Sequence, residues 1–263
     1  MREFFVNENP VFLFKPFGLI HNLFTTTALL AVIIIFINRN KISNIKEKTT
    51  WNILRVGATI LLINMFIYTF GNLHYGCFNY KEMLPFHLCF IANYMFMYAV
   101  YTKNINILRI TIFMCFIGPI PAILWPELTS TIDNFNFWQL IISHHFFLNL
   151  SLFSYFALNY RVRKIDYIKT FILLVTLLLL SYPFNKLFDT NYIFTNYMPK
   201  NVVDLYPWVV KFPLLLVLFV LGFVISIIIY LILIVPRNKE LDRMIENEKK
   251  RIKETKTNKK SNN

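Results

Sequence analysis

Glycine is scarce in this chain. Only six glycines occur among 263 residues, and no two are spaced as GxxxG. That spacing lets membrane helices approach backbone to backbone, so its absence excludes this mode of packing. There is also no glycine-rich phosphate loop, so nothing supports a nucleotide-driven protein. The 28 phenylalanines and 14 tyrosines are expected to fill the interior and the interfacial belts instead.

Cysteines and clustered metal ligands are also scarce. Cys77, Cys89 and Cys115 are odd in number and lie mostly in apolar runs, which argues against a disulfide framework. The five histidines show no HxxxH or HExxH spacing. We therefore expect no metal and no cofactor.

Long apolar runs are abundant. The chain is 56% hydrophobic, too apolar for an ordinary soluble domain. A membrane core needs roughly 20 apolar residues per span, and in lipid only helices satisfy every backbone group within one segment. The sequence predicts an all-α, polytopic membrane protein, a bundle of seven transmembrane helices at about 17–37, 51–71, 84–101, 106–125, 135–158, 167–187 and 208–235.

Basic residues lie mostly on one side of these predicted spans. Of 27 Lys and Arg, 21 lie in the 38–55, 102–109 and 159–169 connections and in the tail, against six on the other side. By the positive-inside rule, the N-terminus is outside and the C-terminus cytoplasmic. We expect a multi-pass protein of the cell membrane whose basic loops and tail contact anionic cytoplasmic lipid, with no nucleic acid as a partner.

One domain and a tail are predicted. Residues 1–236 form the seven-helix domain, because no internal repeat or linker divides them. Pro236 is expected to end the last span. Residues 237–263 then form a basic cytoplasmic tail, partly a short amphipathic helix and then disordered.

Histidines inside apolar runs are the main site candidates. His87 follows Leu84-Pro85 at the start of the third run, and His144 and His145 lie within the fifth. An ionisable side chain at such a position marks a site by default. Neighbouring residues on a helix point about 100° apart, so His144 and His145 cannot both face one substrate atom. The rival reading is that the histidines only form structural hydrogen bonds.

Other polar residues sit around the same outer ends of the spans. Gln139 and Ser143 share a helix face with spacing four. Glu127 follows a proline-broken helix end, where it could orient a histidine or simply be solvated. The long 188–207 connection is expected to cap the outer cavity. The inner halves look almost wholly apolar, which favours a site open to one side only.

Several segments, taken in order, resemble a known family. They are Leu84-Pro85-Phe86-His87-Leu88-Cys89, Gly118, Trp125-Pro126-Glu127-Leu128, Phe137-Trp138-Gln139 through Ser143-His144, Thr195-Asn196-Tyr197-Met198 and Pro207-Trp208. Together they resemble the YwaF-like bacterial integral membrane proteins, which are similar to the animal transmembrane acyltransferase family of ether-phospholipid metabolism.

The resemblance implies a lipid acyl site between His87 and His144, with Gln139, Ser143, Glu127, Trp138 and Asn196 as substrate-binding residues. In the animal acyltransferase family a nucleophilic cysteine directly precedes the first histidine. Phe86 occupies that position here. The nucleophile therefore stays open between histidine-activated water, another side chain such as Cys89 or Ser143, and no chemistry at all.

The sequence thus predicts an outer-facing, histidine-lined cavity that acts on or binds a phospholipid or fatty-acyl ester. In the enzymatic version His144 is the general base, and His87 is a second proton-transfer or oxyanion-stabilising group. The alternative is a proton-linked transporter or small-molecule binding membrane protein without catalysis. A purely structural role is a third reading.

Overall fold

A computed structural model describes residues 2–6 and 11–261 of the chain. Within these residues all regular secondary structure is helical, and one isolated β-bridge joins Leu13 to Ser130. The helices of the first half are α1 (Arg2–Val6), α2 (Leu19–Ile37), α3 (Arg39–Ile42), α4 (Glu47–His74), α5 (Tyr80–Met83), α6 (Leu88–Thr102), α7 (Ile105–Ile117) and α8 (Pro119–Leu124).

The second half begins with the broken fifth span and ends with a long terminal helix. Its elements are α9 (Phe135–Leu140), η1 (Ile141–Phe146), α10 (Phe147–Ala157), α11 (Lys164–Phe188), η2 (Tyr192–Phe194), α12 (Lys200–Leu205), η3 (Pro207–Lys211), α13 (Leu214–Ile229), η4 (Tyr230–Ile234) and α14 (Val235–Ser261). Of these, η1 and η4 are π-helical, whereas η2 and η3 are 3₁₀ turns.

Within residues 2–6 and 11–261, six helical segments are long and apolar enough to cross a membrane. The sequence predicted seven. The difference is α6, which is apolar but has only 15 residues, about 22 Å at 1.5 Å per residue. The third span was predicted to start at Leu84, with His87 one turn inside the helix. Instead the helix begins at Leu88 and His87 is its N-cap residue, because residues 84–87 form a turn.

Local sequence explains where several helices begin and end. The Asn104 side chain accepts hydrogen bonds from the backbone N–H groups of Asn106 and Ile107, which caps α7. Asn134 caps α9 in the same way. Gly118 separates α7 from α8, and the two prolines of α8 cannot donate backbone hydrogen bonds. The bend that the sequence predicted there is confirmed.

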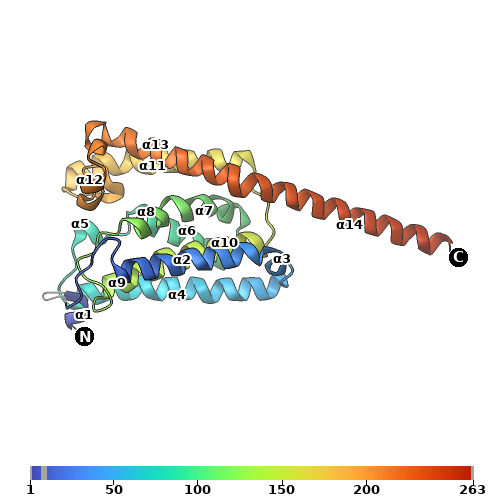
Figure 1. The fold of residues 1–263 in the computed structure, drawn as a ribbon, viewed down its shortest axis with the longest axis horizontal. Helices are drawn as coiled ribbons and strands as arrows, with labels where there is room; N and C mark the ends of the chain where they lie inside the picture. The colour runs from blue at the N-terminus through green and yellow to red at the C-terminus, as the bar shows by residue number, and fades with distance from the viewer. Residues whose placement is uncertain (1, 7–10, 262–263) are drawn as a thin grey trace.

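The helices form a bundle with its core between α4, α6, α7 and α10 (Figure 1). Leu54, Phe96, Ile112 and Phe147 are fully buried in this core. A Cβ atom on Gly57 would lie 2.5 Å from Leu150 Cδ1, so a larger residue there would force the Leu150 side chain of α10 to shift. In Figure 1, α11 and α13 form a second layer beside this core.

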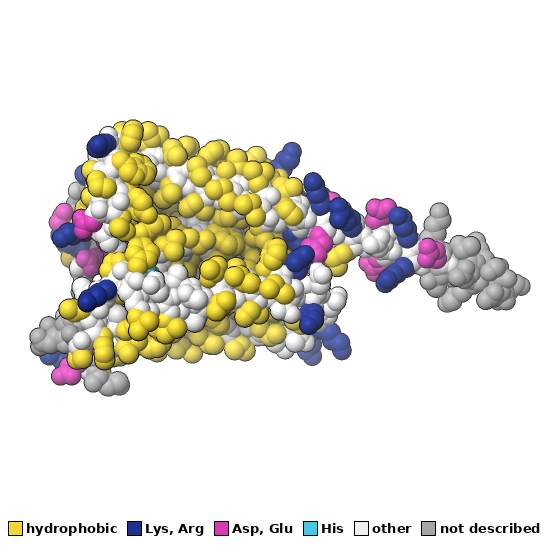
Figure 2. Space-filling view, viewed as in Figure 1, with side chains coloured by type: hydrophobic (Ala, Val, Ile, Leu, Met, Phe, Trp, Pro, Cys, Tyr) yellow, Lys and Arg dark blue, Asp and Glu magenta, His cyan; other side chains and the backbone are white. Residues whose placement is uncertain are grey.

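The two ends of the bundle differ in charge. The histidine end, where α5, α8, α9 and α12 gather, lies on the left of Figure 1. The basic end comprises residues 38–47, 103–104 and 158–163. In the space-filling view, Lys and Arg side chains gather at this end and along α14, while hydrophobic side chains cover the flanks between the ends (Figure 2).

The last span continues into the tail without a break. Pro236 was predicted to end it, yet the helix runs from α13 through η4 into α14 and ends at Ser261. A proline normally clashes with the carbonyl four residues before it. The wider turn of η4 lies directly before Pro236 and accommodates the ring. Over the described residues one long helix continues past Pro236. The predicted disordered end of the tail stays a prediction.

Candidate functional site

The fifth span changes its helical winding where its histidines lie. Between α9 and α10, residues 141–146 form the π-helix η1, and Ser143, His144 and His145 are buried there. A π-helical turn is one residue wider than an α-helical turn, and it occurs often at functional sites because it redirects side chains and frees carbonyls. Successive side chains still point in different directions in a π-helix, so the expectation that His144 and His145 diverge is unchanged.

The freed carbonyls of this segment are bonded by side chains. His144 Nδ1 lies 2.9 Å from the Leu140 carbonyl oxygen and 2.9 Å from Ser143 Oγ. Asn93 Nδ2, from α6, donates to the carbonyl of Ser143 at 3.0 Å. The first two bonds fix the imidazole relative to its own span, and the Asn93 bond ties η1 to α6.

The bond to Leu140 selects the tautomer of His144. A carbonyl oxygen can only accept, so Nδ1 carries the proton and Nε2 keeps a free lone pair. That Nε2 is buried and has no hydrogen-bond partner within the described residues. A buried polar atom without a partner costs free energy unless a ligand satisfies it. Nε2 of His144 is thus a buried acceptor that no described residue satisfies.

His87 lies at the N-terminus of α6, between the bundle and the 188–207 connection. Its ring centroid is 5.0 Å from that of Tyr192 and 5.6 Å from that of Phe194. The 188–207 connection therefore covers His87, as expected for a cap. No hydrogen bond or ring contact joins His87 to His144 within the described residues, so a site shared by the two histidines stays a prediction.

The cap over His87 holds a strained backbone. Ile193 and Phe194 both have φ of 57°, a left-handed conformation that is costly for a β-branched residue such as isoleucine. The buried Asn185 side chain holds the turn, since its Nδ2 donates to the Tyr192 carbonyl oxygen at 2.7 Å. Such strain persists only where the surroundings impose it, and it concentrates at functional sites.

The other sequence-predicted residues take different places. Gln139 is buried in α9. Trp138 Nε1 donates to the Ile132 carbonyl at 2.9 Å, and Asn196 Nδ2 donates to the Thr190 carbonyl at 2.7 Å. Both bonds stabilise loops, although the buried Asn196 Oδ1 has no partner among the described residues.

Glu127 lies at the surface of the loop between α8 and α9. Partial burial of its carboxyl raises the pKa, and the nearby Glu82 adds to the rise. No hydrogen bond from Glu127 to a histidine is seen within residues 2–6 and 11–261, so the suggested orienting role of this carboxylate remains a prediction.

The remaining histidines serve the fold or the surface. His21 accepts a bond from the Phe17 backbone N–H at Nδ1, and its Nε2 lies 2.8 Å from the carbonyl oxygen of Ile123. It therefore fastens α2 to α8. His74 is exposed beside Tyr75. In the described part of the chain no three His, Cys, Asp or Glu residues are grouped as a metal site.

Sequence reasoning missed Asn93 and Tyr192. Asn93 is an amide inside an apolar run, the same signal that singled out the histidines, so it could have been found. Tyr192 gave no such signal in its loop. The inner halves are also less apolar than expected, because Thr50, Thr111, Ser151 and Ser154 are buried there.

A comparison with protein-family models shows the family to which this chain belongs. The model of the TMEM164 family matches residues 15–233, which include every span-length helix at least in part. This chain belongs to the TMEM164 family. Neither a curated protein nor a solved structure matches it. The matched region of this TMEM164-family protein includes His87, η1 and the capping connection, and together with the six apolar helices it identifies a membrane protein.

Proposed function

We propose that this TMEM164-family protein is a membrane enzyme that transfers or hydrolyses a lipid acyl group, with His144 as the general base. The observation that carries the proposal is the buried Nε2 of His144, which has no partner in the described chain. Histidine is the usual side chain for proton transfer near neutral pH. The resemblance to the ether-phospholipid acyltransferases supports the same reaction class.

The proposed reaction begins when His144 Nε2 accepts a proton from a hydroxyl group. That group is water in hydrolysis and an alcohol of the acceptor lipid in transfer. The oxygen adds to the acyl ester carbonyl, and His87 stabilises the resulting oxyanion. When the intermediate collapses, the leaving alkoxide takes the proton back from His144. No covalent acyl-enzyme is required, in agreement with Phe86 in place of the family cysteine.

Ser143 fits a positioning role better than that of nucleophile. Its hydroxyl lies beside Nδ1 of His144, whereas the free lone pair is on Nε2, so His144 cannot deprotonate Ser143 with the nitrogen that is free. Gln139, Glu127, Trp138 and Asn196 are proposed to line the substrate path at the same end.

The proposed placement is in the cell membrane, with the histidine end outside. The 21 basic residues of the opposite side would then face anionic cytoplasmic lipid. The seventh span of this topology is α6, which is short for an average bilayer but reaches the required depth where the bilayer is locally thinned.

A second candidate function is proton-linked transport or small-molecule binding. It is favoured by buried polar atoms that lie further toward the basic end and have no partner in the described residues, among them both amide atoms of Asn64 and Tyr155 OH. A transporter needs polar groups through its whole depth.

The test uses the purified full chain in lipid nanodiscs with labelled phospholipid and acyl donors. His87→Ala and His144→Ala should each lower turnover at least about 100-fold, the usual contribution of general acid–base catalysis. The matched control is His74→Ala, because His74 is exposed. Thermal unfolding of every variant checks the fold.

Two results would overturn the enzymatic proposal. One is turnover in His144→Ala equal to that in His74→Ala. The other is no turnover in the wild type, together with uptake of protons or solute into liposomes that depends on His144. The second result would assign the chain to the transport class.

A further inference from the structure

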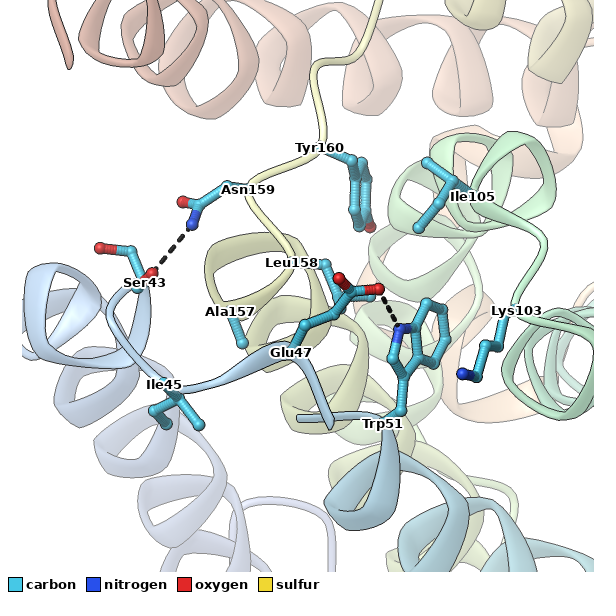
Figure 3. A pocket seen from close by; sticks show the side chains of 10 residues that line it. All are labelled: Ser43, Ile45, Glu47, Trp51, Lys103, Ile105, Ala157, Leu158, Asn159 and Tyr160. Atoms are coloured by element: carbon cyan, nitrogen blue, oxygen red, sulfur yellow. Dashed lines mark hydrogen bonds between the residues drawn. The ribbon is translucent and has the colours of Figure 1, made fainter. Parts of the chain in front are cut away.

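A cavity of about 440 Å³ opens at the basic end, away from the histidines. Three connections line it: the one between α3 and α4, the α6–α7 turn, and the residues that follow α10. Its volume lies in the range of ligand pockets, which run from about 300 to 1,000 Å³. Figure 3 shows Glu47, Trp51, Lys103 and Tyr160 around the cavity.

The cavity wall carries one positive and one negative side chain. Glu47 Oε1 accepts a hydrogen bond from Trp51 Nε1 at 3.0 Å. Lys103 Nζ lies 5.9 Å from the centroid of the Trp51 ring. Neither Glu47 nor Lys103 has an ion-pair partner within 4.0 Å in the described residues, although they face the same cavity.

Their unpaired state contrasts with the charges around them. Arg161 pairs with Asp242, and both Arg39 and Arg237 pair with Glu240. The pairs Arg161–Asp242 and Arg39–Glu240 dock the first turns of α14 on the basic end, whereas Arg237–Glu240 lies within α14. Oppositely charged side chains are thus present at the basic end, but they pair with one another outside the cavity and not with Glu47 or Lys103.

The cavity wall is also fixed in shape. Trp51 and Tyr160 are 3% and 5% exposed, so their rings are held by packing. Lys103 and Asn159 both adopt left-handed backbone conformations, with φ of 54° and 52°. Asn159 Nδ2 donates to the Ser43 carbonyl at 2.9 Å, which ties two of the three connections together (Figure 3). The cavity wall is therefore preformed, while the two charged side chains, Glu47 and Lys103, are exposed at its mouth.

We infer that this cavity binds a phosphate ester that also carries an ammonium group, the chemistry of a zwitterionic phospholipid headgroup. Lys103 takes the phosphate. Glu47 takes the ammonium group. A purely anionic headgroup would face the Glu47 carboxylate without compensation, so it binds less well. This site lies at the end opposite His144, and it does not rest on the proposed reaction.

The experiment measures lipid binding to the purified full chain in detergent by native mass spectrometry. The probes are phosphatidylethanolamine, phosphatidylglycerol and diacylglycerol with identical acyl chains. Phosphatidylethanolamine should bind most tightly. Lys103→Gln should weaken binding of both phospholipids about tenfold, and Glu47→Gln should remove the preference for phosphatidylethanolamine. Gln at position 47 can still accept the Trp51 bond, so only the charge is lost.

Matched controls are Lys48→Gln and Glu248→Gln, which remove exposed charges that do not line the cavity. Water-soluble glycerophosphoethanolamine distinguishes the source of the ligand. If it competes with the lipid, a free phosphate ester suffices, and if it does not, the ligand is the lipid itself.

Three results would overturn the inference. They are tighter wild-type binding of phosphatidylglycerol, equal binding of diacylglycerol, and cavity variants that bind like their surface controls. Because the first two are measured on the wild type alone, the inference is testable even if a variant fails to fold.

Discussion

The two ends of the bundle are each closed around one buried polar side chain, but the two side chains differ in charge. At the histidine end, Asn185 makes four hydrogen bonds to residues 190–195, and each is between 2.6 and 2.9 Å. At the basic end, Arg237 is 2% exposed. Its Nη2 donates to Asn159 Oδ1 at 2.6 Å, and its Nη1 lies 2.8 Å from Glu240 Oε2.

The amide of Asn185 is fully satisfied, whereas the guanidinium of Arg237 is not. Nε and Nη1 of Arg237 make no hydrogen bond within the described residues, so the short contact with Glu240 is an ion pair with poor hydrogen-bond geometry. A neutral, saturated amide rigidifies a loop. A buried charge depends instead on the one carboxylate that compensates it. The loop at the histidine end is therefore held the more rigidly, whereas the stability of the basic end depends more on the charge of a single ion pair.

The largest effect is expected from Asn185→Ala. It removes four hydrogen bonds and leaves buried groups of the capping connection unpaired, which should cost about 2–4 kcal/mol. Hydrogen exchange of the backbone amides of residues 190–197 measures the loss. The exchange should be faster in the variant than in the wild type. Asn40→Ala, on the surface of the basic end, is the matched control. Equal protection of residues 190–197 in both variants would contradict the role given to Asn185.

The second-largest loss of stability is expected from Glu240→Gln. It leaves the Arg237 charge buried and uncompensated, and we expect a loss of about 2–3 kcal/mol, below the value for a fully buried pair because Glu240 is 29% exposed. Arg237→Met removes the charge itself and should cost less. Thermal unfolding of the two variants compares them. The reverse order would show that packing of Arg237 on Phe156 outweighs its charge.

Ser143→Ala should have a smaller effect, about 1 kcal/mol, which is typical of one neutral hydrogen bond. The bond from His144 Nδ1 to the Leu140 carbonyl remains, so the tautomer should not change. Nitrogen NMR of histidine-labelled protein reports the tautomer directly. A shift of the proton to Nε2 would mean that Ser143, and not the carbonyl, selects it.

Much of the fold could be predicted from the sequence, because span-length apolar runs and the two prolines of α8 are local signals. The start of α6 and the π-helix η1 could not. Helical propensity does not distinguish an α-helical from a π-helical turn at residues 141–146, and the choice depends on packing against α6, where Asn93 bonds the Ser143 carbonyl.

The candidate site was partly predictable for a similar reason. His87 and His144 were singled out because ionisable groups in apolar runs need a reason to be there. The structural bonds of Trp138 and Asn196 go to backbone carbonyls of Ile132 and Thr190, and loop carbonyls carry no sequence signal. The cavity at the basic end is formed by three connections far apart in the chain, so no local pattern could indicate it.

The smallest effect concerns the ion pair between Lys81 and Asp189, which closes the histidine end at its surface. Lys81 lowers the pKa of the Asp189 carboxyl below its usual range. A depressed folded-state pKa means that the pair stabilises the fold above the unfolded pKa, near 4, and that this contribution is lost as the pH falls through the folded pKa.

Asp189→Asn keeps a residue that tolerates the left-handed backbone at this position (φ 51°). Wild type should therefore lose slightly more thermal stability than the variant on acidification below about pH 4, with little difference at neutral pH because the pair is exposed. Parallel acid profiles would mean that the capping connection is held by Asn185 alone.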